Sequence, residues 1–281
     1  MKNIKIYAFA DEASPNIEEQ ITAMKRNGLN GLEIRGVDGV NISDITAEKA
    51  KEVKQKLDNS GLTVWSIGSP IGKIDIEKDD FGAHVEKLKH TLEIANILGA
   101  ENLRLFSFYI PQGKNAEDYS GEVLDRLGKM AELSIMAGIT PCHENEKGIY
   151  GENAERCLEI YNELPLISGI FDPANFVQCG VDTAKAWKML NPYIKYLHIK
   201  DALADGTVVP AGEGAGNLKN ILCDFASFGG KAVTIEPHLT VFNGLSQLER
   251  EGGETKIQSK YIFEDSDAAF DAACDAFKKL L

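Results

Sequence analysis

The chain has 281 residues, which suits one large barrel of about 250 residues or two ordinary domains. Its 43 acidic residues outnumber its 30 lysines and arginines, and the net charge of −13 repels nucleic-acid phosphates and anionic membrane surfaces. Asp11 comes too early for a signal sequence, and no apolar run reaches the roughly 18 residues that cross a bilayer. We therefore expect a cytoplasmic protein without nucleic-acid or membrane partners.

Strand-like and helix-like segments alternate along the whole chain. The strand-like runs lie at 3–9, 31–36, 62–68, 102–107, 139–144, 167–172, 194–199 and 232–236. Four of the intervening helices are expected to end on glycines that lead directly into the next strand, at Gly28, Gly61, Gly99 and Gly138. This recurrence is typical of a βα repeat. It predicts an α/β protein with a single (β/α)8 TIM barrel formed by residues 1–281.

Three local features add expectations about the helices and loops. Ser14 followed by Pro15 predicts the start of the first helix. His84 and His90 lie in a helical stretch, and we expect both at the surface. Residues 237–264 form a loop after the eighth strand that is too long for a plain βα turn. We expect this segment to act as a lid or a partner-binding arm at the barrel mouth, with a disordered or decorative insertion as the alternative.

Four residues with metal-binding side chains stand at the C-terminal ends of different apolar runs: Glu144, Asp172, His198 and Glu236. Their separations of 28, 26 and 38 residues are close to one strand-plus-helix unit each, so their side chains are expected to converge at one face of a barrel. Three carboxylates and one imidazole suit one divalent ion, and these ligand types do not choose among manganese, magnesium, cobalt and zinc. Salt bridges or helix caps are the alternative.

Further polar residues are candidates for the chemistry or for substrate binding. Lys200 shares a strand face with His198, so it either contacts substrate and assists proton transfer or forms an ion pair with Asp201 or Glu213. Glu33, Arg35 and Arg104 alternate with apolar residues, so they point into the barrel and bind substrate, unless Glu33 pairs with an arginine. The other substrate-binding candidates are Trp65, Lys73, Glu146, Asn175, Glu213 and His238.

A glycine-rich loop at residues 211–216, AGEGAG, precedes a helix near the place where many barrels hold a phosphate. Glu213 places a negative charge in this loop and argues against a phosphate. A turn that positions Glu213 or gates the mouth is the favoured interpretation.

Taken together, these motifs resemble the xylose isomerase-like barrel superfamily, in the branch of sugar phosphate isomerases and epimerases. The branch includes inosose dehydratases and ketose 3-epimerases, and endonuclease IV is a more distant relative. The likeness covers essentially the whole chain, through AFADE, GLEIRG, LRLFSF, HENEKGIYG, FDPANF, HIKDA, AGEGAG and TIEPH. It implies that Glu144, Asp172, His198 and Glu236 bind the metal. Glu146 and Asn175 stand where histidines are common in relatives, which argues against several metals.

The resemblance implies a divalent-metal-dependent isomerase or epimerase that acts next to the carbonyl of a small sugar or sugar derivative. Glu144 and Glu236 would transfer the proton through an enediolate, with Lys200 assisting. A keto-cyclitol or keto-sugar dehydratase or lyase is the nearest alternative. Endonuclease IV-like DNA repair and a non-catalytic binding barrel are more distant ones. A homo-oligomer, with residues 237–264 reaching a neighbouring subunit, is left open.

Overall fold

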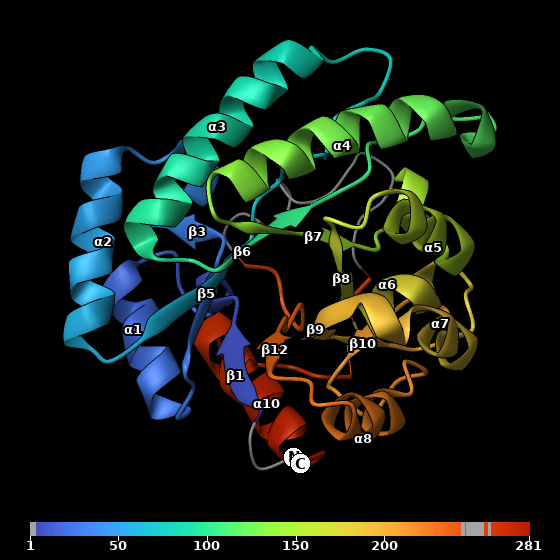
Figure 1. Cartoon of the computed structure of the whole chain (residues 1–281). Helices are drawn as coiled ribbons and strands as arrows, with labels where there is room; N and C mark the ends of the chain where they lie inside the picture. The colour runs from blue at the N-terminus through green and yellow to red at the C-terminus, as the bar shows by residue number, and fades with distance from the viewer. Residues whose placement is uncertain (1–3, 243–244, 246–255, 258–259) are drawn as a thin grey trace.

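The computed structural model describes residues 4–242, 245, 256–257 and 260–281. Eight parallel strands close into a barrel in the order β1-β12-β9-β8-β7-β6-β5-β2, and helices surround it (Figure 1). The barrel strands are β1 Lys5–Ala8, β2 Gly31–Ile34, β5 Thr63–Ile67, β6 Asn102–Leu105, β7 Thr140–Glu144, β8 Ser168–Phe171, β9 Ile194–Ile199 and β12 Ala232–Ile235. Each falls within one of the eight predicted runs, so the predicted (β/α)8 barrel is confirmed.

The helices lie outside the barrel and cover its strands. They are α1 Ile17–Arg26, α2 Ala47–Asn59, α3 Phe81–Leu98, α4 Ser120–Met136, α5 Ala154–Glu163, α6 Pro173–Gln178, α7 Thr183–Leu190, α8 Leu218–Ser227 and α10 Ser266–Lys278. Short 3-10 helices are η1 Ala10–Glu12, η2 Ile42–Asp44, η3 Ala116–Tyr119, η4 Tyr150–Glu152 and η5 Asn191–Tyr193. Two small hairpins extend the loops, β3 Gly36–Val37 with β4 Val40–Asn41 and β10 Asp201–Ala202 with β11 Val208–Val209. No helix among the described residues is long and apolar enough to span a membrane.

The helix ends show where local signals hold and where they shift. Gly99 ends α3 with φ 73°, the left-handed conformation that glycine adopts without strain, as the predicted glycine cap requires. The first helix begins later than Ser14 and Pro15 predict. Its cap is Asn16, whose side chain accepts hydrogen bonds from the backbone N–H groups of Glu18 and Glu19. The Ser14 hydroxyl instead accepts a hydrogen bond from the backbone of Asn16.

The amino end of the barrel interior is filled by aromatic side chains. Tyr7 stacks on Trp65 with ring centroids 5.4 Å apart, and Tyr196 meets Trp65 edge-on at 6.0 Å. Trp65 also lines a cavity with Lys195 and Lys231, at the start of β9 and just before β12. Trp65, expected as a substrate-binding residue, therefore lies at the end of the barrel opposite the predicted metal ligands. It is an extra residue in β5, because β2 pairs with the residues before and after it.

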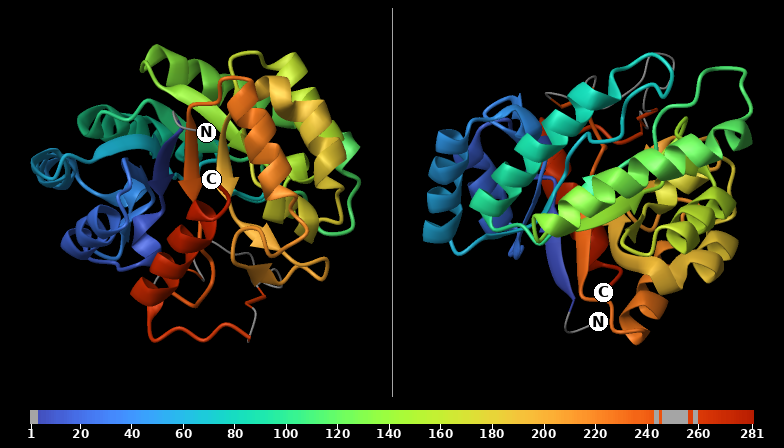
Figure 2. Two further views of the ribbon diagram at one scale, coloured as in Figure 1. Left: turned by 90° about the horizontal axis from the view of Figure 1, so that it is seen from below. Right: turned by 45° about the horizontal axis from the view of Figure 1, so that its top comes forward.

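The described parts of 237–264 lie at the carboxyl end of the barrel. Phe242 is buried, 5.2 Å from the guanidinium of Arg35 and 5.5 Å from the ring of His238. The Tyr261 hydroxyl donates a hydrogen bond to Glu213. Figure 2 shows the chain before α10 crossing the end to which the strand arrows point. The lid or arm role stays a prediction, and residues 243–244, 246–255 and 258–259 of this segment lie outside the described residues.

Candidate metal centre

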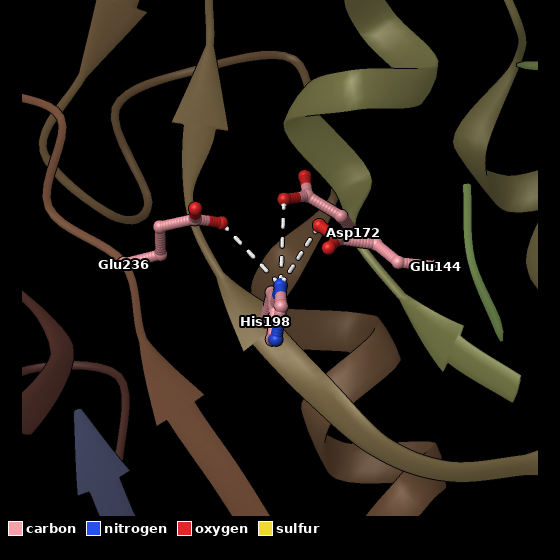
Figure 3. Close-up of side chains that lie close together, drawn as sticks. All are labelled: Glu144, Asp172, His198 and Glu236. Atoms are coloured by element: carbon pink, nitrogen blue, oxygen red, sulfur yellow. Dashed lines mark hydrogen bonds and ion pairs between the residues drawn. The ribbon is translucent and has the colours of Figure 1, made fainter. Parts of the chain in front are cut away.

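Four strand ends bring the predicted metal ligands together. Glu144 ends β7, Asp172 follows β8, His198 lies in β9 and Glu236 follows β12. All four side chains are buried, and one donor atom from each lies within 4.8 Å of the others. His198 Nδ1 faces all three carboxylates, 2.9 Å from Glu144 Oε1, 3.3 Å from Glu236 Oε2 and 3.9 Å from Asp172 Oδ2 (Figure 3).

This cluster fits a divalent cation. Donor atoms about 2.1 Å from a shared metal ion lie about 3.0–3.5 Å from one another, and the two shorter contacts of His198 Nδ1 are close to this spacing. Asp172 Oδ2 is buried without a hydrogen bond, because its contact with Lys200 Nζ at 2.9 Å has ion-pair rather than hydrogen-bond geometry. The residues therefore offer a hard, mostly oxygen donor set, and one of its buried oxygens accepts no hydrogen bond.

The other nitrogen of His198 is held by Glu33. Nε2 donates a hydrogen bond to Glu33 Oε2 at 3.0 Å, and Glu33 Oε1 accepts a second one from the Tyr196 hydroxyl at 2.9 Å. Among the described residues the partners of Glu33 are a histidine and a tyrosine rather than the arginine of the expected ion pair, and its contact with a substrate stays a prediction. A carboxylate behind a histidine fixes the ring orientation and directs the opposite nitrogen toward a metal.

Two cations border the cluster. Lys200 Nζ lies 2.9 Å from Asp172 Oδ2 and 3.0 Å from Glu236 Oε2, so the predicted pairing with Asp201 or Glu213 is replaced by these two carboxylates. Arg104 Nη1 lies 3.0 Å from Glu144 Oε2, and the guanidinium also donates to two backbone carbonyls. Asn175 Nδ2 donates to Glu144 Oε1 at 3.3 Å. Lys200, Arg104 and Asn175 thus belong to the site.

The neighbouring cations and the burial of the site give the three carboxyl groups different pKa values. Burial raises the pKa of Glu144, but His198 and Arg104 outweigh it and lower that pKa to about 2. Burial also raises the pKa of Glu236. The charges of Lys200 and His238 outweigh this effect and lower that pKa well below its ordinary value. Burial raises the pKa of Asp172 to about 7, against the pull of Lys200. The carboxylates in turn raise the pKa of His198 well above its ordinary value despite burial, so a cation would replace a proton on Nδ1.

A second group of charges lies beside Glu236. Arg35 forms ion pairs with Asp11 at 2.8 Å and Glu12 at 3.1 Å, and its Nη1 is 3.5 Å from Glu236 Oε1. His238 Nδ1 is 3.2 Å from Glu12 and 3.7 Å from Glu236. Arg35 and His238 therefore lie beside the cluster, and their contact with a substrate stays a prediction. Glu12 is a residue that sequence reasoning missed, although AFADE places it just beyond the first strand, where the same rule found the other acids.

Besides Trp65, three predicted substrate-binding residues are not brought to the four-residue cluster by any described contact: Lys73, Glu146 and Glu213. Lys73 pairs with Glu146 at 3.0 Å, and its ammonium lies 4.4 Å from the ring centroid of Phe106. Glu213 is exposed and accepts a hydrogen bond from Tyr261.

His84 corrects another expectation, because it is buried rather than at the surface. Its Nε2 accepts a hydrogen bond from the backbone of Gly72 at 2.7 Å, and burial lowers its pKa to about 4.

The glycine-rich loop encloses a carboxylate of the chain itself. Asp201 accepts hydrogen bonds from the backbone N–H groups of Gly212, Gly214 and Gly216 at 2.9–3.0 Å, and from Ala202 at 3.0 Å. A side chain at Gly214 or Gly216 would collide with this carboxylate. The donors that a phosphate would need are thus already used by Asp201.

The fold and the site together define a class, the (β/α)8 barrels that gather metal-type ligands at the carboxyl ends of their strands. Within that class, the chain belongs to the xylose isomerase-like TIM barrel family, whose model matches residues 21–241. The family assignment made from the motifs is confirmed.

Solved structures of similar fold cover nearly the whole chain. A D-psicose 3-epimerase determined in the presence of D-fructose is 14% identical, with TM-score 0.76 and 98% of each chain covered. The IolI protein with a zinc atom is 15% identical, with TM-score 0.74, covering 99% of this chain and 98% of its own. The probable 3-DHS dehydratase AsbF from Bacillus anthracis is 16% identical, with TM-score 0.72 and 98% of each chain covered. At these identities the likeness shows the shared fold. A sequence comparison with curated proteins gives no match.

Proposed function

We propose that the protein is a divalent-metal-dependent isomerase or epimerase that acts next to the carbonyl of an uncharged sugar or sugar derivative. One observation carries the proposal: four buried donor atoms from four strand ends lie within 4.8 Å of one another. Glu144 and Glu236 extend toward His198 from opposite sides (Figure 3). Their strands, β7 and β12, are separated in the barrel by β8 and β9. Two carboxylates on opposite sides suit removal of a proton from one face of a carbon and its return to the other.

The residues of the cluster would have two roles, metal binding and proton transfer. Glu144, Asp172, His198 and Glu236 would hold the cation, which when bound would polarise a substrate carbonyl and stabilise negative charge on its oxygen. Glu144 and Glu236 each turn one carboxylate oxygen toward the His198 nitrogen and the other toward an arginine, Arg104 or Arg35. One of the two glutamates takes the carbon-bound proton and later releases it to solvent. The other takes up a proton from solvent and delivers it to the opposite face.

The low pKa values of the two glutamates set a condition on this chemistry. A carboxylate with a pKa of about 2, such as Glu144, is a weak base. Proton removal therefore depends on a substrate that is acidified at the carbon, and a carbon beside a polarised carbonyl has this property. The requirement supports a ketose or keto-cyclitol over a substrate without a carbonyl.

Lys200 would have different roles in isomerisation and in elimination of water. A dehydratase or lyase shares the first proton removal but also needs a group that protonates the departing oxygen, for which Lys200 is the candidate. Burial would lower the pKa of this lysine, but Asp172 and Glu236 raise it well above its ordinary value. The ammonium lies 2.9 Å from Asp172 Oδ2 and 3.0 Å from Glu236 Oε2, so its contacts suit the balancing of negative charge. We therefore assign Lys200 a charge-stabilising and substrate-orienting role and keep the lyase as the alternative.

The charge of the site favours an uncharged substrate. Three backbone donors of the glycine-rich loop and the backbone donor of Ala202 are satisfied by Asp201, which supports the interpretation against phosphate at this loop. The nearby cations Lys200, Arg104 and Arg35 each lie against carboxylates. Because these cations are already neutralised by carboxylates, the site has little positive charge left for a phosphate. An uncharged sugar therefore suits the site better than a sugar phosphate.

The proposal is tested by incubating the metal-loaded protein in deuterated water with a panel of free ketoses and keto-cyclitols and with their phosphates. We expect deuterium on the carbon beside the carbonyl, formation of an isomer and no loss of water, with the free sugars preferred. Glu144→Gln and Glu236→Gln should each abolish exchange at one face, because glutamine keeps an oxygen but accepts no proton. The exposed Glu93→Gln, on α3, is the matched control.

The outcomes separate the alternatives. A product lighter by one water, or a new ultraviolet absorbance, moves the assignment to the dehydratase. Neither exchange nor elimination across the panel, with metal bound, contradicts both activities and leaves the binding barrel.

A further inference from the structure

A cavity of about 550 Å³ lies at the amino end of the barrel, away from the metal centre. It is bordered by α7, by the start of β9 and by the turn between α8 and β12. Cavities that bind small molecules in proteins have volumes of about 300–1,000 Å³. The size of this cavity therefore suits an organic molecule with one or two rings.

Four aromatic side chains contribute to the walls of this cavity. Trp65, Trp187, Phe225 and Phe228 line it, and Trp187 meets Phe225 edge-on with ring centroids 6.3 Å apart. Phe228 is 70% exposed and stands at the rim. The indole N–H groups of Trp65 and Trp187 are buried and have no hydrogen-bond partner among the described residues. A flat ring would pack on the aromatic side chains that line the cavity.

The charge of the cavity has one sign. Lys195 and Lys231 are its only charged residues among the described lining, and no acidic side chain lines it. Among the described residues neither lysine forms an ion pair, and Lys195 Nζ has only a 3.4 Å contact with the Thr140 hydroxyl. In a chain with a net charge of −13, two lysines left without carboxylates beside an aromatic cavity indicate an anionic ligand.

We propose that this cavity binds a small planar organic anion, an aromatic ring that carries a carboxylate or a sulfonate. The ring occupies the space between the tryptophans and phenylalanines, and the acid group lies against Lys195 and Lys231. This site is separate from the metal centre and does not depend on the reaction proposed for it.

Tryptophan fluorescence can report ligand binding in this cavity. It has two tryptophans, Trp65 and Trp187, and both line the cavity. Titration with 2-naphthoate should therefore change the tryptophan emission along a saturable curve, and calorimetry should give the same midpoint. The uncharged 2-naphthalenemethanol should bind at least about tenfold more weakly, because it lacks the charge-assisted contact with the lysines.

Variants locate the binding. Lys195→Met combined with Lys231→Met should weaken naphthoate binding about tenfold or more and leave binding of the alcohol unchanged. Lys188→Met, an exposed lysine on α7, is the control. Phe228→Ala should weaken both ligands, and Asp172→Ala should weaken neither. Circular dichroism checks that each variant is folded.

Three results would overturn the proposal. They are the absence of saturable naphthoate binding, equal affinity for naphthoate and the alcohol, and unchanged naphthoate affinity in the double lysine variant. Loss of binding in Asp172→Ala would place the anion at the metal centre and would contradict the second site as well.

Discussion

At the scale of single residues, the metal centre depends on which nitrogen of His198 faces the carboxylates. Glu33 holds Nε2 at 3.0 Å, so Nδ1 is the nitrogen turned toward Glu144, Asp172 and Glu236. A rotated ring would present the wrong atom. Glu33 would therefore act on a bound metal through the histidine and not as a ligand.

This role predicts an effect of Glu33 on metal affinity. Glu33→Leu should weaken divalent-metal binding about 10- to 100-fold, because the histidine loses the partner that orients it. Glu33→Gln should retain most of the affinity, since its amide oxygen can still accept the hydrogen bond. Competition with a fluorescent chelator measures both. Equal affinities for the Leu and Gln variants would contradict the orienting role, and Tyr196→Phe is the control for loss of the hydrogen bond to the other carboxylate oxygen.

Removal of a ligand itself should have a larger effect. We expect about one divalent ion per chain in the purified protein and nearly none in Asp172→Ala or His198→Ala, because three of the four protein ligands leave an incomplete shell. Elemental analysis gives the metal content. Glu93→Ala, which removes an exposed carboxylate from α3, should keep the full amount. Undiminished metal in both ligand variants would show that the ion binds elsewhere.

Sequence reasoning located the residues that stand at strand ends and missed those defined by a distant partner. Glu144, Asp172, His198 and Glu236 could be grouped because a parallel barrel brings all its carboxyl ends to one face. Glu33 meets a histidine 165 positions away, and nothing local in the chain signals that contact. The register shift that makes Trp65 an extra residue of β5 likewise depends on the pairing with β2 and has no local signal in the sequence.

At the scale of elements, a buried histidine of α3 makes a hydrogen bond with the loop after β5. His84, near the start of α3, accepts a hydrogen bond from the backbone of Gly72. Gly72 has φ 92° and lies so close to the backbone of Phe106 that no side chain fits there. The next residue is Lys73, which pairs with Glu146. The buried imidazole thus fixes the loop that carries Lys73.

This contact predicts a pH dependence of stability. Burial lowers the pKa of His84 from 6.5 to about 4, so between these values the unfolded chain binds a proton that the folded chain does not. Stability contributed by the neutral histidine is complete above about pH 6.5 and is lost as the pH falls toward 4. From about pH 7.5 to about pH 5 the loss should be about 2 kcal/mol.

Urea unfolding of the natural chain and of His84→Gln at the two pH values isolates this contribution from that of other groups. The natural chain should lose about 2 kcal/mol more than the variant, which has no group to titrate at this position. Identical pH dependence in both proteins would contradict the buried, neutral state of His84.

At the scale of the whole molecule, charge argues against the DNA-repair alternative. The chain carries a net charge of −13, and DNA-binding proteins gain much of their affinity from lysines and arginines that neutralise phosphates. We expect no measurable binding to a duplex that contains an abasic site at physiological salt. Fluorescence polarisation with a labelled duplex tests this expectation. Binding that weakens steeply with added salt would revive the alternative.

The carboxylate enclosed by the glycine-rich loop also bears on how such a barrel evolves. Asp201 satisfies four backbone donors beside the mouth, and glycines at 214 and 216 leave room for it. Replacement of this one aspartate by glycine would leave the same four donors converging on an empty position of the size of an anion. A barrel proposed to act on free sugars therefore stands one amino-acid change away from a receptor for their phosphates.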